Sequence, residues 1–293
     1  MTEVLVAGLS TVDFVMRVET LPTRADKYRA RDASVVLGGC GANAALAIAR
    51  QGGRARLVSR LGGDAIGALI VERLDAAGID TSLVHRSPGG MSSFSSVQVD
   101  SAGERQIVNF RGAGLAERPD WFDDPGAPQA VLTDTRWPAL AQKVLGMARA
   151  RGIPGVIDAE APIDPAALAG ATHIAFSAQG LEDYAGGTVT EAALRRAAAE
   201  FGCWVAVTEG ANGVRFLEDG TIGHVPAFPV HAVDTLGAGD VWHGVLALCL
   251  AEGADTRRAI RRANAAAALK CTGFGGASAC PDRAATDALL KEI

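Results

Sequence analysis

The sequence predicts an α/β fold, in which a doubly wound, mostly parallel sheet is flanked by helices and carries a small β-sheet lid. Short apolar runs alternate with alanine-rich helical stretches along most of the chain, and two stretches of a different pattern interrupt that rhythm. The chain has 293 residues, which is enough to bury one large core. We therefore expect a single domain over residues 1–293, with lid segments inserted at about 11–36 and 91–111.

Each strand of the main sheet is predicted from a short apolar run, as is typical of strands that are buried on both faces. The runs are VLVAGL (4–9), ARLVSRLG (55–62), AVLTD (130–134), PGVIDA (154–159), HIAFS (173–177) and WVAVTEG (204–210). Residues 42–53 and 65–79 have the pattern of helices that end at glycine.

The lid is predicted from the two stretches that break the alternation. Residues 92–110, SSFSSVQVDSAGERQIVNF, alternate polar and apolar residues around the turn DSAGE, which indicates a β-hairpin. Residues 11–36 place threonine, valine and charged residues around a turn at LPTRADK. We expect these stretches to form one small sheet over the main domain.

Composition and charge exclude several classes of function. A net charge of -5 and a pI near 5.6 argue against a nucleic-acid surface. The apolar stretch 241–251 is too short to span a bilayer, so we expect no membrane partner. The first apolar run has no basic flank, and five scattered cysteines indicate reduced thiols, so we expect a cytoplasmic protein without a targeting segment.

The strongest chemical signal is the stretch VDTLGAGDVWHGVLALCLAEG (233–253), in which small residues and an acid precede an apolar helix. The N-terminus of a helix has unpaired N–H groups and binds anions, and small side chains let a ligand approach them. A carboxylate at Asp240 would accept a proton from an attacking hydroxyl while these N–H groups hold phosphoryl charge. Alone, the same pattern also fits an ordinary N-cap aspartate.

Two signatures together resemble the ribokinase-like (PfkB) sugar-kinase family. One is DTLGAGD (234–240), and the other is LGGCGANAALAIARQGGRARLVSRLGGDAIG (37–67), in the order and spacing of the family. The resemblance extends from Val4 to about Pro281 and implies a ribokinase-like fold, ATP as phosphate donor, and a small-molecule sugar as acceptor.

The resemblance also implies roles for individual residues. Asp240 matches the catalytic base, and Gly237, Ala238 and Gly239 complete the anion hole. The positions that match sugar-binding residues are Asp13, Gly38, Gly39 and Asn43. The positions that match ATP-binding residues are Thr208, Gly210, Gly213, Asn264 and Gly275. Asp234 and the backbone of Leu236 match a monovalent-cation (K⁺) site of some members, and a turn-capping aspartate is the alternative interpretation of Asp234.

One segment departs from the family pattern. Many members have an Asn-x-x-Glu motif that organises Mg²⁺ and the phosphates, whereas this chain has Ser177-Ala-Gln-Gly180. Mg²⁺ would then be held by phosphates and water, with Glu182, Asp158 or Glu160 compensating. We expect Mg²⁺ to be required and assign it no ligand.

Five shorter strings, among them LPTRADKYRAR (21–31) and VLTDTRW (131–137), resemble the bacterial sulfofructose kinases. That resemblance implies phosphorylation of 6-deoxy-6-sulfofructose at O1, with Lys27, Asn109 and Arg136 binding the sulfonate. Asn43 is the generic family residue, which leaves fructose, another ketohexose or a phosphorylated sugar as alternatives.

Two other classes of protein remain as alternatives. Residues 39–44 fit a GxGxxA dinucleotide fingerprint, but no acidic residue ends the next strand at LVSR. A non-catalytic sugar-binding protein on the same fold is the second alternative. The lids of such kinases also pair in homodimers, which the resemblance alone leaves open.

Overall fold

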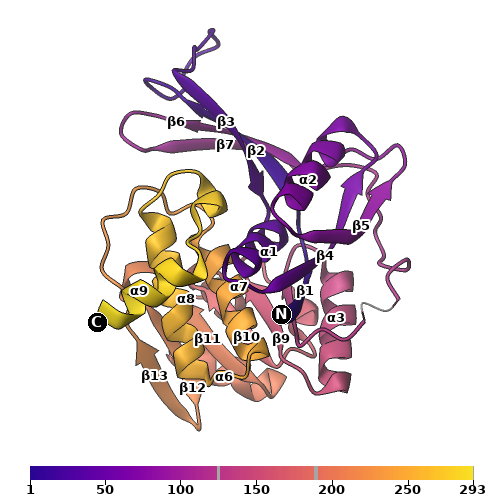
Figure 1. The fold of residues 1–293 in the computed structure, drawn as a ribbon, viewed down its shortest axis with the longest axis vertical. Helices are drawn as coiled ribbons and strands as arrows, with labels where there is room; N and C mark the ends of the chain where they lie inside the picture. Colours follow the sequence, from indigo (N-terminus) through magenta and orange to yellow (C-terminus); the bar gives the residue numbers. More distant parts are fainter. Residues whose placement is uncertain (124–125, 188–190, 293) are drawn as a thin grey trace.

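The computed structural model describes residues 1–123, 126–187 and 191–292. A nine-stranded sheet forms the body of the molecule, and a four-stranded sheet projects from one end of it (Figure 1). The predicted fold class is confirmed: a doubly wound, mostly parallel sheet is flanked by helices and carries a small lid. Among the described residues, no helix is both long and apolar enough to cross a lipid bilayer.

The large sheet has the strand order β13-β12-β11-β10-β9-β8-β1-β4-β5. Its strands are β1 (Glu3–Ala7), β4 (Arg54–Gly62), β5 (Asp80–Ser87), β8 (Ala130–Asp134), β9 (Gly155–Ala159), β10 (His173–Ser177), β11 (Trp204–Thr208), β12 (Val214–Glu218) and β13 (Thr221–Val225). The strands from β5 to β11 pair in parallel, and β12 and β13 add an antiparallel edge. The apolar runs predicted the six central strands, whereas β5, β12 and β13 are less apolar and were not predicted.

Helices cover both faces of this sheet, which is why its strands are apolar on both sides. One face carries α1 (Cys40–Arg50), α2 (Ala65–Ala76), α7 (Ala238–Ala251) and α8 (Thr256–Cys271). The other face carries α3 (Pro138–Arg151), α4 (Pro165–Leu168), α5 (Ala178–Ala185) and α6 (Glu191–Phe201). The C-terminal α9 (Arg283–Glu292) packs on α8, and two short 3₁₀ turns are η1 (Gly210–Asn212) and η2 (Gly276–Ala279).

The lid is the four-stranded sheet β3-β2-β6-β7. Its strands are β2 (Thr11–Arg17), β3 (Asp32–Gly38), β6 (Phe94–Val99) and β7 (Arg105–Phe110). The predicted hairpin is present, because β6 and β7 pair antiparallel and the Asp100 carboxylate accepts the N–H groups of Ala102 and Glu104 in their turn. The two predicted lid segments therefore meet in one sheet, joined through the parallel pair β2–β6.

Helices α1 and α7 approach each other closely at a glycine, and this contact places the N-terminus of α7 beside α1. A Cβ atom added to Gly244 on α7 would lie 2.5 Å from the main-chain oxygen of Ala44 on α1. No other residue type fits that space without moving one of the helices.

We predict that Gly244→Ala destabilises the protein by about 1–3 kcal/mol, because the new methyl group forces the two helices apart. The matched control is Gly146→Ala on α3, where an added Cβ atom meets nothing within 4 Å. That control should be neutral or stabilise by up to about 1 kcal/mol, since alanine favours helix over glycine. Thermal or urea unfolding measures both; equal effects of the two substitutions would contradict the packing argument.

Candidate active site

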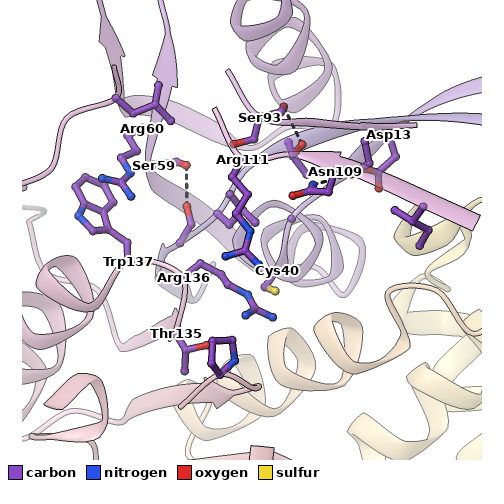
Figure 2. A pocket seen from close by; sticks show the side chains of 18 of the residues that line it. Asp13, Cys40, Ser59, Arg60, Ser93, Asn109, Arg111, Thr135, Arg136 and Trp137 are labelled. Atoms are coloured by element: carbon purple, nitrogen blue, oxygen red, sulfur yellow. Dashed lines mark hydrogen bonds between the residues drawn. The ribbon is translucent and has the colours of Figure 1, made fainter. Parts of the chain in front are cut away.

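The site forms where the strand order of the large sheet reverses. From β1 the chain continues to β4 and β5 on one side, and it later returns through β8 on the other side of β1. In open α/β sheets, ligands bind beyond the C-terminal ends of the strands at such a point. A cavity of about 650 Å³ lies there, between the body and the lid (Figure 2).

The cavity is lined by polar and apolar residues from both parts of the molecule. The body contributes Gly8, Leu9, Gly39, Cys40, Ser59, Arg60, Thr135, Arg136, Trp137 and Leu236, and the lid contributes Thr11, Asp13, Ser95, Ile107 and Asn109. The buried Asp134 carboxylate connects two lining segments, because it accepts the N–H of Leu9 at 2.7 Å and that of Arg136 at 2.9 Å. The loops after β1 and β8 are thereby fixed to one another.

The N-terminus of α7 presents a small-residue turn beside this cavity. Gly237 is the N-cap in the left-handed conformation, with φ of 75°, which glycine adopts without strain. A Cβ atom added to Gly239 would meet nothing within 4 Å, so the space in front of the first turn is open. The first turn of a helix leaves N–H groups without intrahelical partners. Here the N–H of Ala238 donates to the main-chain oxygen of Thr235 at 3.2 Å, so the N–H groups of Gly237, Gly239 and Asp240 are the ones that offer an anion site.

Asp240 lies at this helix end and adjoins the cavity. Its Oδ2 accepts a hydrogen bond from Nδ2 of Asn43 on α1, at 2.7 Å. Its carboxylate, the Cys40 thiol and the Asp158 carboxylate have ligand atoms within 4.8 Å of one another, and Cys40 lines the cavity. Burial raises the pKa of Asp240 to about 6, the Asn43 hydrogen bond opposing the shift and the negative charges of Glu160 and Asp134 adding to it.

Burial also shifts the pKa values of the groups around Asp240. Burial, and then the charges of Asp240 and Glu160, raise the pKa of Asp158 well above its ordinary range. Burial likewise raises the pKa of the Cys40 thiol, so this cysteine stays protonated and is no nucleophile. His243 is buried, its two ring nitrogens lie 2.8 and 3.2 Å from the main-chain oxygens of Gly239 and Ala175, and burial lowers its pKa.

The residues predicted to bind sugar lie around the cavity, with one exception. Asp13, Gly39 and Asn109 line it, and Gly38 lies against Asp13, where an added Cβ atom would be 2.4 Å from the carboxylate. Asn43 keeps its buried Oδ1 without a hydrogen-bond partner in the described part of the chain. Lys27 is the exception, because it lies exposed in the loop between β2 and β3 and does not line the cavity.

The predicted ATP-binding residues lie outside this cavity. Thr208 ends β11, Gly210 begins the 3₁₀ turn η1 that follows, Gly213 caps that turn, and Gly275 precedes η2. Asn264 is buried on α8, where its Oδ1 accepts from the indole N–H of Trp242 at 2.7 Å and its Nδ2 donates to the main-chain oxygen of Pro226 at 3.0 Å. Its amide is used within the protein core, so it holds β13 and α7 to α8 rather than facing a ligand.

The expected monovalent-cation site is also at variance with the contacts. The ammonium of Lys270 donates to the main-chain oxygen of Asp234 at 2.6 Å and lies 3.7 Å from its Oδ2. Leu236 lines the cavity, and its N–H donates to Oδ1 of Asp234 at 2.9 Å. A positive charge of the protein thus lies beside the carboxylate at which K⁺ was expected.

Two arginines of the cavity were not predicted. Arg60 ends in the cavity, with its guanidinium 4.3 Å from the ring centroid of Trp137, and Arg111 follows β7 (Figure 2). The available signal was a basic residue at or after the end of a predicted strand, which is the edge where ligands bind. That signal is weak, because basic residues are common at strand ends on any surface.

Comparison with known proteins agrees with the two signatures. The model of the pfkB family of carbohydrate kinases matches residues 1–283. The chain belongs to the pfkB family. Ribokinase from Bacillus subtilis is 29% identical over 296 residues, which cover 99% of this chain and 100% of that protein. A protein from Halopiger xanaduensis called ATP-dependent ribose-1-phosphate kinase is 30% identical, with 100% of this chain and 99% of that one covered.

Solved structures of this kinase family have the same fold. A protein from Agrobacterium tumefaciens, provisionally called a ribokinase, superimposes with a TM-score of 0.92 at 36% identity, covering 99% of this chain and 98% of that one. Ribokinase from Thermotoga maritima gives a TM-score of 0.83 at 26% identity, covering 99% and 100%. This pfkB chain is therefore an ATP-dependent sugar kinase, which excludes the dinucleotide oxidoreductase and disfavours the non-catalytic alternative.

We predict that Asp240→Asn still binds sugar and ATP but loses at least about a hundredfold in turnover, because the general base is removed. Steady-state kinetics and a direct binding measurement separate the two effects. Near-normal turnover would reject Asp240 as the base.

We also predict the pH dependence of kcat/KM, which reports ionisation of the free enzyme. Only ionised Asp240 accepts a proton, and its pKa is raised to about 6. As pH falls through that value the carboxylate is protonated, so log kcat/KM should decline with unit slope below it and level off above it. A profile that stays flat down to about pH 5 would contradict this assignment, because a base with a pKa of about 6 is mostly protonated at that pH and its loss would lower kcat/KM.

Proposed function

We propose that this kinase phosphorylates a ketohexose-type sugar that carries an anionic group, with 6-deoxy-6-sulfofructose, phosphorylated at O1, as the first candidate. The observation that carries the proposal is the charge of the cavity: Arg60, Arg111 and Arg136 line it against one aspartate, Asp13. Guanidinium groups bind three-oxygen anions such as sulfonate or phosphate through paired hydrogen bonds. Arg136 is ion-paired with Glu160, so a neutral sugar would leave the charge of Arg111 without a partner among the described residues.

Arg111 is the main support for an anionic substrate. Within the described residues it has no hydrogen bond or ion pair, and its side chain points toward Arg136 and Cys40 (Figure 2). Arg136 is more constrained, since it is ion-paired with Glu160 and donates to the main-chain oxygen of Ala161 at 2.8 Å. Arg111 is thus the guanidinium free to take a ligand, and Arg136 would assist from a fixed position.

The chemistry follows from the groups beside Asp240. Asp240 would take the proton of the attacking hydroxyl, while Asn43 orients the carboxylate through Nδ2 and offers its unpartnered Oδ1 to a sugar hydroxyl. The N–H groups at the start of α7 would hold the charge that develops on the transferred phosphoryl group. The lid excludes water from the site when it covers the sugar.

Mg²⁺ fits the acidic side of this site. Asp158 is buried beside Asp240, and Glu160 lies nearby on the same segment, whereas Glu182 is exposed on α5. Carboxylate oxygens are the donors that a hydrated divalent cation prefers. Asp158 and Glu160 would hold Mg²⁺, which neutralises phosphate charge when bound.

A second candidate substrate is a sugar phosphate. The same three arginines suit a phosphate, and the Halopiger relative is named for a sugar phosphate, ribose 1-phosphate. Other relatives are named ribokinase and fructokinase, for neutral sugars. A kinase assay across sulfofructose, fructose, fructose phosphates, ribose and ribose 1-phosphate decides between them. The highest kcat/KM on a neutral sugar would reject the anionic class of substrates.

A homodimer formed through the lid stays a prediction.

We predict that Arg111→Gln raises KM for the anionic sugar by about tenfold or more and changes that for fructose little, since one charge-assisted contact is lost. Arg136→Ala should discriminate in the same direction. Lys27→Ala is the matched control, because it removes an exposed lid charge that does not line the cavity. Equal effects of Arg111→Gln on charged and neutral sugars would remove the proposal.

A further inference from the structure

Lys270 is a buried charge that the proposed chemistry does not use. It lies in the last turn of α8, and its side chain is fully buried. A buried ammonium is costly unless it is paired and hydrogen-bonded. Here it donates to the main-chain oxygen of Asp234 at 2.6 Å and lies 3.7 Å from Oδ2 of the same residue.

The carboxylate of Asp234 is fully occupied by protein groups. Oδ1 accepts the N–H of Leu236 at 2.9 Å and Nη2 of Arg105 at 2.8 Å, and Oδ2 accepts the N–H groups of Gly275 and Gly276 at 3.1 and 3.0 Å. Burial alone would raise the pKa of Asp234, but these N–H groups and the ammonium outweigh it and lower the pKa. A carboxylate offers about four lone-pair positions, so none is left for a metal ion.

These contacts do not fit the monovalent-cation site that the family resemblance places at Asp234 and Leu236. A bound K⁺ needs free oxygens, and at the Asp234 carboxylate it would meet the charge of Lys270, which lies 3.7 Å from Oδ2. We propose that the ammonium of Lys270 takes the place of the monovalent cation, so that this kinase works without K⁺. An ammonium suits that role, since it is a compact single charge with three donors.

The geometry gives Lys270 a positioning role. Residues Asp234 to Gly237 form the turn that leads into α7, and α7 begins with the anion hole and Asp240. Lys270 fixes the first residue of that turn from α8, and the main-chain oxygen of Cys271 accepts the N–H groups of Val233 and Asp234. The charge at Lys270 would thus hold the turn in the shape that aims its N–H groups at phosphate.

The first test uses the unaltered full chain, with KCl exchanged for choline chloride at matched ionic strength. Turnover on any accepted sugar should change by less than about twofold, and the melting temperature should shift by less than about 2 °C. A crystal soaked in RbCl should show no anomalous peak at Asp234. A saturable rise of about tenfold in turnover with K⁺, or Rb⁺ bound at Asp234, would overturn the proposal.

The second test compares two substitutions of the same residue. Lys270→Ala opens space, so turnover should fall about tenfold or more in choline and be restored in part, saturably, by K⁺, with a rise in melting temperature. Lys270→Met fills that space without a charge, so it should lose turnover and show no K⁺ response. Arg258→Ala, on the exposed side of α8, controls for loss of a cation and should behave as the unaltered chain.

A folded Lys270→Ala without K⁺ rescue, or a fully active Lys270→Met, would contradict the role of the charge. If neither variant folds, the K⁺, melting and Rb⁺ measurements on the unaltered chain decide the question. The inference rests on the proposed function only where turnover is the readout. The melting and Rb⁺ measurements need no catalysis. An error in the proposed sugar or base would therefore leave their results unchanged, and an error in the cation-site proposal would change them.

Discussion

The site depends on one close contact, in which α7 begins beside α1 with only a glycine between the helices at Gly244. That contact brings the amide of Asn43 within 2.7 Å of the Asp240 carboxylate and directs the open N-terminus of α7 toward the same place. An anion site and a base with a raised pKa are therefore two consequences of a single packing arrangement. Substitutions that move either helix would disturb both together.

The lid and the body meet around the same turn. Arg105 at the start of β7 pairs with Asp234, and the guanidinium of Arg17 on β2 lies 3.8 Å from the ring centroid of Phe274. The turn before α7 thus contacts Lys270 of α8 and Arg105 of the lid hairpin. The lid strand β7 and the turn before α7 are therefore connected through one carboxylate, that of Asp234.

Much of this was accessible from the sequence, for identifiable physical reasons. Strands buried on both faces are continuous apolar runs, so β1, β4 and β8 to β11 were predicted, and the glycine-rich turn before α7 marked Asp240. What the sequence does not give is side-chain direction. Lys27 and Asn264 occupy matching positions in the chain, but the side chain of Lys27 lies exposed and that of Asn264 bonds to Trp242 in the core. No local pattern distinguishes a buried, paired Lys270 from a surface lysine at a helix end.

The central claim is that one carboxylate and one helix N-terminus act on the same phosphorus atom. A crystal structure with the accepted sugar, Mg²⁺ and a non-hydrolysable ATP analogue tests it most directly. The account predicts the attacking hydroxyl about 3 Å from Asp240 and the terminal phosphate against the first turn of α7. A terminal phosphate bound elsewhere, or a sugar whose hydroxyls all lie out of reach of Asp240, would contradict it.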